Sequence, residues 1–243
     1  MSQAEIRIGT AGWSIARGAA DRFPAEGSGL ERYAAVFNAV EINSSFHRPH
    51  RASTWERWRD SVPEGFWFAV KVPKWITHEA RLVDFDEALA AFIGETGALG
   101  DKLAVLLVQL PPKLEFDPAV TEQFFATLAA LSSAAIACEP RHASWFTDEA
   151  DELLKHLMVA RVAADPARHE GAGVPGGWRG LSYWRLHGSP VMYRSSYADR
   201  IAGYAAALRE DRATGREAWC VFDNTASSAA TSDALALKDA LGA

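Results

Sequence analysis

The chain has 243 residues, of which 49% are hydrophobic and 23% are charged, and this composition is typical of a folded globular protein rather than a disordered one. Its formal net charge of −6 provides no general attraction to nucleic acid or to an anionic membrane surface, so such a partner would need a local basic patch. The uncharged stretch 123–138 is shorter than the roughly 18 residues that a membrane span requires.

The first residues and the cysteines bear on the compartment. The segment MSQAEIRIGTAGW lacks the basic region, apolar run and small-residue cleavage site of a secretory signal. The two cysteines, Cys138 and Cys220, both lie inside apolar runs, which favours two buried thiols over a disulfide or a metal pair. We therefore expect a cytoplasmic protein with no membrane partner.

Short apolar segments alternate with longer segments of helical periodicity along the whole chain. In chain order we expect a strand at Ile6–Gly12, a helix at Gly29–Asn38, a strand at Ala39–Ser45, a helix at Ala52–Ser61, a strand at Phe66–Val72, a helix at Asp84–Leu99, a strand at Leu103–Leu110, a helix at Pro118–Leu131, a strand at Ile136–Arg141, a helix at Thr147–Leu157, strands at Val162–Asp165 and Tyr183–Gly188, a helix at Tyr197–Arg212, a strand at Trp219–Asn224 and a helix at Ala226–Leu241. Asp117 before Pro118 forms a good helix start.

The alternation predicts an α/β fold with a single (β/α)8 TIM-type barrel of eight parallel strands, in one domain that spans residues 1–243. Between strands six and seven, Pro166–Gly180 contains five glycines and two prolines and predicts a long irregular loop. An open doubly wound sheet is the rival architecture. It is disfavoured because no strand leads into a Gly-rich nucleotide-binding loop.

Polar residues interrupt these apolar strands mainly at their carboxyl ends. They are Glu41, Asn43 and Ser45 on the second strand, Lys71 on the third, Gln109 on the fourth, Glu139 and Arg141 on the fifth, Asp165 on the sixth, Tyr183, Arg185 and His187 on the seventh, and Asp223 and Asn224 on the eighth. Parallel strands in a closed barrel would bring all of these ends to one rim, where barrel enzymes carry their chemistry. We expect a functional pocket there; the alternative is a purely structural layer of ion pairs.

Residue types at this rim suggest separate roles. Glu41, Glu139 and His187 are the candidates for acid–base catalysis. Lys71, Arg141 and Arg185 suit a phosphate or a carboxylate. The further candidates for substrate binding are Asn43, Gln109, His142, Asp223 and Asn224, with Trp13 and Trp145 as stacking surfaces and His78 as an additional rim residue.

At these residues the sequence resembles the YecE-like family, domain of unknown function number seventy-two. The matching stretches are residues 6–14 (IRIGTAGWS), 40–48 (VEINSSFHR), 68–73 (FAVKVP), 76–78 (ITH), 107–112 (LVQLPP), 139–145 (EPRHASW), 183–188 (YWRLHG) and 222–225 (FDNT). The resemblance implies a TIM-type barrel similar to the endonuclease-four and xylose-isomerase barrels, and it supplies no reaction. The sequence departs from the family pattern at His47, Pro140 and Asp223.

Three hypotheses for function follow. The first is an enzyme that acts by acid–base chemistry on a small anionic substrate, phosphorylated or nucleotide-like, with metal-dependent phosphoester hydrolysis as a variant in which a divalent metal binds the rim carboxylates. The second is a barrel that binds an anion without turnover. The third is a structural role for the rim charges. A nucleic-acid substrate is possible but disfavoured by the net charge.

Overall fold

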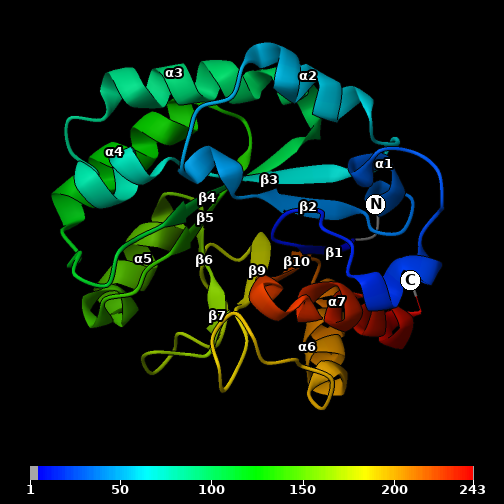
Figure 1. Cartoon of the computed structure of the whole chain (residues 1–243). Helices are drawn as coiled ribbons and strands as arrows, with labels where there is room; N and C mark the ends of the chain where they lie inside the picture. Colours follow the sequence, from blue (N-terminus) through cyan, green and yellow to red (C-terminus); the bar gives the residue numbers. More distant parts are fainter. Residues whose placement is uncertain (1–4, 243) are drawn as a thin grey trace.

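Parallel strands form the centre of the structure and helices surround them (Figure 1). The structure, a computed structural model, describes residues 5–242. The strands are β1 (Ile6–Thr10), β2 (Ala39–Ile42), β3 (Trp67–Lys71), β4 (Leu103–Gln109), β5 (Ala135–Glu139), β6 (Val159–Arg161), β7 (Ala163–Asp165), β8 (Gly176–Gly177), β9 (Leu181–Leu186) and β10 (Glu217–Phe222). The α-helices are α1 (Gly29–Ala34), α2 (Ala52–Asp60), α3 (Asp86–Thr96), α4 (Pro118–Leu131), α5 (Asp148–His156), α6 (Ile201–Ala213) and α7 (Ala229–Leu241).

The strands form two sheets. One has the order β1-β10-β9-β7 and the other the order β2-β3-β4-β5-β6-β8, and every pair is parallel except the short β6–β8 pair. Only Val162 separates β6 from β7, so one continuous stretch of chain belongs to both sheets. The fold is therefore α/β with parallel sheets, as the sequence predicts.

The two sheets also meet between β1 and β2. There, hydrogen bonds from side chains supplement a short backbone contact. The backbone supplies one parallel bridge, Ala11 to Glu41, and a hydrogen bond from Gly12 N to Glu41 O of 2.8 Å. The Tyr33 hydroxyl accepts a hydrogen bond from Thr10 N (2.8 Å) and donates one to Ala39 O (3.1 Å). These bonds occupy backbone groups that a regular ladder would otherwise pair.

Asn38 makes a second pair of such bonds to β1. Its Oδ1 accepts from Ile8 N (2.9 Å) and its Nδ2 donates to Ile6 O (3.0 Å). Glycine is required at position 9 because a Cβ there would lie 2.2 Å from Ala39 O. The close approach of β1 and β2 thus depends on one glycine and on two polar side chains.

Apolar side chains fill both faces of the strands. The face toward the helices belongs to a large core that includes Val70, Leu106 and Cys138 of the strands. The opposite face forms a separate inner cluster of Ala39, Ala69, Val105, Leu107, Ala137, Ala160, Val162, Leu181, Tyr183, Trp219 and Val221. Continuous apolar runs on these strands reflect burial on both sides.

Most predicted elements are confirmed, with shifted ends. The predicted strand Val162–Asp165 corresponds to β7 (Ala163–Asp165). A further short strand that was not predicted, β6 (Val159–Arg161), directly precedes it. Between Pro166 and Gly180 the described chain contains no helix and only the two-residue β8, in agreement with the predicted loop. Both cysteines are buried free thiols. Among residues 5–242, no helix has the length and apolar character needed to cross a bilayer.

Candidate functional site

The polar residues of the strand ends share one face with the inner apolar cluster. Side chains alternate along a strand, so Ala39 and Glu41 point the same way, as do Ala69 and Lys71. The same alternation places Leu107 and Gln109 on one face of β4, and Ala137 and Glu139 on one face of β5. We therefore find an apolar floor with a polar layer directly above it, at the carboxyl ends of the strands.

Arg185 is the centre of this layer. It has no solvent-exposed surface, and its guanidinium binds Glu41 in a bidentate manner, with Nε to Oε2 at 3.0 Å and Nη2 to Oε1 at 2.7 Å. It also donates to Glu139 through Nη1 and to Asp223 through Nη2 (3.2 Å). Although burial alone would lower the pKa of Arg185, Glu41 and Glu139 raise it well above the ordinary value. One cation thus joins carboxylates from β2, β5 and the end of β10.

His187 lies between two of these carboxylates. Its Nδ1 is 2.9 Å from Asp223 Oδ2 and its Nε2 is 3.1 Å from Glu139 Oε1. A neutral imidazole has one N–H, so both contacts are hydrogen bonds only in the imidazolium. Burial opposes this charge, but Glu139 and Asp223 together raise the pKa of His187 above its ordinary value. Both the geometry and the direction of this pKa shift favour the protonated form of His187.

Glu139 collects more donors than any other carboxylate of the layer. Its Oε1 accepts from Gln109 Nε2 (3.1 Å) and from Arg141 Nε (3.2 Å) and Nη2 (3.0 Å), besides His187. Burial alone would raise the pKa of Glu139, but Arg185, His187 and Arg141 hold it well below its ordinary value. Glu139 is consequently a permanent anion, which suits it to orient a proton donor better than to act as a base.

Tyr183 completes the support of Glu41 from below. Its hydroxyl donates to Glu41 Oε2 (2.9 Å), and its ring stacks on Trp219 with a centroid separation of 5.8 Å. Burial and the neighbouring Glu41 raise the pKa of Tyr183 well above its ordinary value. Within the described residues, the donors to the Glu41 carboxylate are Arg185 and Tyr183. We therefore assign Glu41 the role of holding Arg185 in place.

Lys71 differs from the other charged residues of the layer. It is 8% exposed, and within residues 5–242 its ammonium makes no hydrogen bond or ion pair. Its Nζ lies 3.9 Å from the ring centroid of Phe46. Burial and the nearby Arg185 lower the pKa of Lys71 to about 8, although the surrounding carboxylates oppose this shift. Among the charged side chains of the layer, Lys71 is the one for which the described residues supply no polar partner.

Two further polar groups lie close to this side of the rim. Asn43 follows β2, and its buried Oδ1 has no hydrogen-bond partner among the described residues. His78 packs its ring edge-on against Phe46 at 5.1 Å. Burial and the positive charges of Lys71 and Arg141 lower the pKa of His78 to about 4. His78 is therefore neutral at physiological pH and its contribution to the rim is uncharged.

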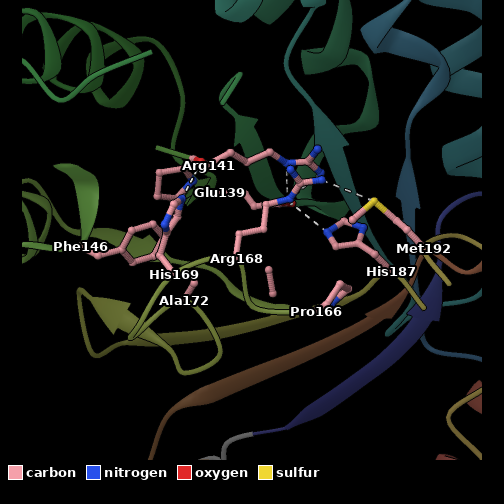
Figure 2. Close-up of a pocket in the computed structure, with 11 residues that line it drawn as sticks. Glu139, Arg141, Phe146, Pro166, Arg168, His169, Ala172, His187 and Met192 are labelled. Carbon is pink, nitrogen blue, oxygen red and sulfur yellow. Dashed lines mark hydrogen bonds and ion pairs between the residues drawn. The ribbon is translucent and has the colours of Figure 1, made fainter. Parts of the chain in front are cut away.

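A pocket opens beside Glu139 and His187 (Figure 2). Its cavity is small, about 20 Å³, inside a space of about 310 Å³ that is partly open to solvent, and its lining also includes Arg141, Arg168 and His169. In Figure 2, His187 and Met192 lie at one end, Phe146 and His169 at the other, with Arg168 between them. The lining combines two arginines, two histidines and one glutamate with six apolar residues.

The rim does not fit a divalent metal. Within residues 5–242, no three His, Cys, Asp or Glu side chains are placed to hold an ion. The carboxylates that the sequence offers as ligands, Glu41, Glu139 and Asp223, already surround the guanidinium of Arg185. A dication placed among them would be repelled by this fixed positive charge.

Several predicted binding residues are placed outside the pocket. Trp145 is 1% exposed, donates its indole N–H to Leu114 O (3.0 Å) and packs against Phe116, so it offers no face for stacking. Trp13 packs edge-on against Trp58 at 5.1 Å. Both tryptophans follow strand ends, and their rings are used in packing, the role that the high count of nine tryptophans favours.

Asn224 and His142 have local structural contacts. Asn224 Nδ2 binds Asp233 Oδ2 (2.6 Å) and Ser195 O (2.9 Å), which fixes the chain after β10. His142 accepts from Ser144 N (3.3 Å) at the start of a short 3-10 helix. Asp165, the polar end of β7, binds Tyr197, Tyr204 and Arg200. These residues shape the rim and do not line the pocket.

The pocket residues Arg168, His169 and Met192 were not predicted as site residues. They lie in loops after β7 and β9, where no two-residue alternation marks the direction of a side chain. The richness of Pro166–Gly180 in glycine was a usable signal, because long loops at the carboxyl ends of barrel strands often carry binding residues.

Comparison with known sequences gives consistent matches to proteins without an assigned reaction. The profile described as "Protein of unknown function DUF72" matches residues 7–243. The UPF0759 protein YunF of Bacillus subtilis (strain 168) is 30% identical over 178 residues, which cover 69% of this chain and 63% of YunF. The UPF0759 protein YecE of Escherichia coli (strain K12) is 32% identical over 82 residues, 34% of this chain and 30% of YecE.

Solved structures with the same fold include two other proteins of this description. A DUF72 family protein from Enterococcus faecalis V583 superposes with a TM-score of 0.82 at 20% identity and covers 98% of this chain and 96% of its own. A second, from Thermotoga maritima MSB8, gives 0.73 at 22% identity with 98% and 99% coverage. A fusion protein with a xylose isomerase-like TIM barrel gives 0.56 at 12% identity and covers 98% of this chain and 42% of that chain. The fold is accordingly TIM-barrel-like.

Proposed function

From the premise that this chain belongs to the DUF72 family, we propose that it is an enzyme that binds a small anionic substrate at the rim and transfers a proton to it from His187. The observation that carries the proposal is the position of His187, which is held as an imidazolium between Asp223 and Glu139 and lies in the wall of a cationic pocket. A purely structural histidine would not need to line a pocket.

Arg141 and Arg168 supply the binding side of this proposal. Arg141 is fixed by its two hydrogen bonds to Glu139. Burial alone would lower the pKa of Arg141, but Glu139 and Tyr193 raise it above its ordinary value. Arg168 is exposed, and the single hydrogen bond that it makes within the described residues is a long one to Met192 Sδ (3.8 Å). A phosphate or carboxylate in the pocket would give both guanidinium groups a stronger partner.

His187 supplies the chemical side. Asp223 orients the ring through Nδ1, and the proton on Nε2 is directed toward Glu139 and the pocket. A substrate oxygen that displaces the Glu139 contact would receive this proton, with Glu139 and Asp223 stabilising the imidazolium before transfer. His187 thus acts as a general acid, whereas the permanent charge of Glu139 assigns it an orienting role.

Calorimetric titration with inorganic phosphate and with pyruvate tests the binding half of the proposal. We expect at least one anion to bind wild type, and Arg168→Ala to weaken that binding about 10-fold or more, because a charge-assisted hydrogen bond contributes about 1.5–3 kcal/mol. Arg179→Ala is the matched control, because Arg179 lies in the same loop, is exposed and does not line the pocket. Equal affinities for wild type and Arg168→Ala would reject this binding site.

Two variants, His187→Gln and Glu139→Gln, distinguish catalysis by His187 from anion binding without turnover. If the barrel only binds an anion, Glu139→Gln keeps or increases the affinity because a buried negative charge is removed, whereas His187→Gln lowers the affinity because a positive charge is removed. If His187 is the acid, His187→Gln loses turnover by about 100-fold or more while the affinity changes little. Retained turnover in His187→Gln would contradict the assignment.

We also propose that the two sheets form one closed ring of eight parallel strands, with β6 and β7 counted as one strand. Two observations support this: the continuity of chain through Val162 and the bridge from Ala11 to Glu41. Closure would explain why carboxylates from β2 and β5 meet the guanidinium of β9. It is the arrangement that TIM-type barrels use to place catalytic residues at one rim.

A further inference from the structure

We infer that Lys71 is a nucleophilic amine and that the substrate is a carbonyl compound, which Lys71 binds covalently as a Schiff base. The inference rests on the proposed function, because it identifies the substrate class of the same rim. Its starting point is the asymmetry of the polar layer, in which every buried charge has several partners except this lysine.

The surroundings of Lys71 explain why it stays unpaired. The three carboxylates Glu41, Glu139 and Asp223 are all bonded to Arg185, and they also accept hydrogen bonds from Tyr183, His187, Gln109 and Arg141. The ammonium of Lys71 instead lies over the ring of Phe46. A buried cation without an anion is costly, and the cost is relieved when the amine releases its proton.

A structural lysine would be expected to reach solvent or a carboxylate, since its side chain is long and flexible. Lys71 does neither, because it is 8% exposed and makes no polar contact within the described part of the chain. A lysine that binds an anion would also need to keep its positive charge, which desolvation opposes. A desolvated amine at the carboxyl end of a barrel strand has instead the properties of a Schiff-base lysine.

The step balances without any oxidant or reductant. The neutral amine of Lys71 attacks the carbonyl carbon, the carbonyl oxygen takes up a proton, and the nitrogen loses one, which gives a carbinolamine. Protonation of its hydroxyl releases water and leaves a carbon–nitrogen double bond to Nζ. Lys71 does not itself line the pocket that contains His187, Arg141 and Arg168, so an adduct on Nζ would have to extend from Lys71 toward these residues.

Reductive trapping tests this inference. Wild-type protein is incubated with pyruvate and cyanoborohydride, and the modified lysines are mapped by mass spectrometry. We expect modification of Lys71 to exceed that of Lys74 and Lys155 at least 10-fold, although these two are about half exposed and Lys71 is buried. Modification confined to the exposed lysines would overturn the inference. Mapping on the wild type keeps the test valid even if variants at position 71 do not fold.

Two further probes separate this inference from the proposed anion site. Glycolaldehyde is an uncharged carbonyl compound, and lactate is an anion without a carbonyl group. Trapping of glycolaldehyde on Lys71 as efficient as that of pyruvate would support the nucleophile and contradict the anion site. Competition by lactate for phosphate binding, with no adduct on Lys71 from either carbonyl probe, would support the anion site and overturn the nucleophile.

Discussion

Arg185 is bonded to three carboxylates and has no exposed surface, so its removal leaves Glu41 buried without its ion-pair partner, whereas Glu139 keeps Arg141 and His187. We expect Arg185→Met to lower the free energy of unfolding by about 3–5 kcal/mol, the range for removal of one member of a buried ion pair. Urea denaturation followed by circular dichroism measures this change.

The control for this prediction is Arg22→Ala. Arg22 also forms a bidentate pair, with Asp239 at 3.2 and 2.9 Å, but both partners are about half exposed. Solvent screens such a pair, and we expect no measurable change in the denaturation midpoint. If both variants lose the same stability, the burial of the Arg185 cluster does not have the energetic importance that we assign to it.

His187 predicts a pH dependence of stability with a defined sign. Its pKa is raised in the folded protein, so its contribution is complete below the ordinary value of 6.5 and is lost as the pH rises through the folded value. The difference in unfolding free energy between wild type and His187→Gln should therefore decrease from pH 6.5 upward. Urea denaturation at several pH values measures it, and a difference that grows with pH in this range would contradict the protonated histidine.

The pKa shift of Lys71 predicts a pH dependence of stability with the opposite sign to that of His187. Its pKa falls from 10.5 to about 8, so the folded protein is destabilised below pH 8, and the penalty disappears as the pH rises toward 10.5. We expect Lys71→Met, which keeps the length of the side chain, to raise the free energy of unfolding at pH 7 by up to about 3 kcal/mol. A functional group that destabilises the fold is the expected signature of an active site.

The matched control is Lys74→Met, three residues further along and about half exposed. Its stability at pH 7 should equal that of wild type, within the uncertainty of denaturant extrapolation. Lower stability of Lys71→Met than of Lys74→Met would indicate that Lys71 is a structural residue. Such a result would also weaken the assignment of Lys71 as the nucleophile.

The sequence predicts which charged residues meet, because the two-residue alternation of each strand fixes the face on which they lie. Glu41, Lys71, Glu139, Arg185 and His187 were all identified in this way and occupy one polar layer. The structural alternative, a layer of ion pairs, expects Glu41 or Glu139 to pair with Arg141, Arg185 and Lys71, and the structure contains such pairs for the two arginines. Which of the expected pairs form depends on distances between strands. For the same reason the sequence does not show that Lys71 is left without a partner.

At the scale of elements, the contact between β1 and β2 is the least regular part of the sheets, and Tyr33 replaces part of its ladder. Tyr33→Phe leaves the buried N–H of Thr10 without its acceptor, and we expect a loss of about 1–3 kcal/mol in urea denaturation. Thr127→Ala, which removes a hydroxyl from an exposed hydrogen bond on α4 and leaves a good helix former, is the control and should not lower the stability. Equal stability of the two variants would show that the junction does not depend on Tyr33.

The sixth strand shows where sequence patterns fail. Its first half, Val159–Arg161, contains an arginine in the middle of a buried segment, which breaks the apolar pattern. In the structure Arg161 binds Asp151 (3.2 Å) on the preceding helix and Gly171 O (2.9 Å) in the following loop, so two neighbouring segments satisfy its polar groups. Helix α4, by contrast, starts as predicted, with Asp117 accepting from Val120 N.

At the scale of the whole molecule, the inner face of the strands is divided into an apolar floor and a polar rim. The floor is a continuous apolar cluster, and the rim holds Glu41, Lys71, Glu139 and Arg185 at the carboxyl ends. The floor excludes water from one side, which strengthens the interactions of the charges above it. The parallel arrangement thus produces a site in which a protonated histidine and an unpaired amine coexist.

A crystal structure of the protein treated with pyruvate and cyanoborohydride tests the central claim most directly. The account predicts electron density continuous with Lys71 Nζ, with the carboxylate of the adduct within hydrogen-bond distance of Arg141 or Arg168 and the former carbonyl carbon facing His187. Clear density for an unmodified Lys71 beside an unoccupied rim, in crystals grown from protein that carries pyruvate adducts on its surface lysines, would contradict it.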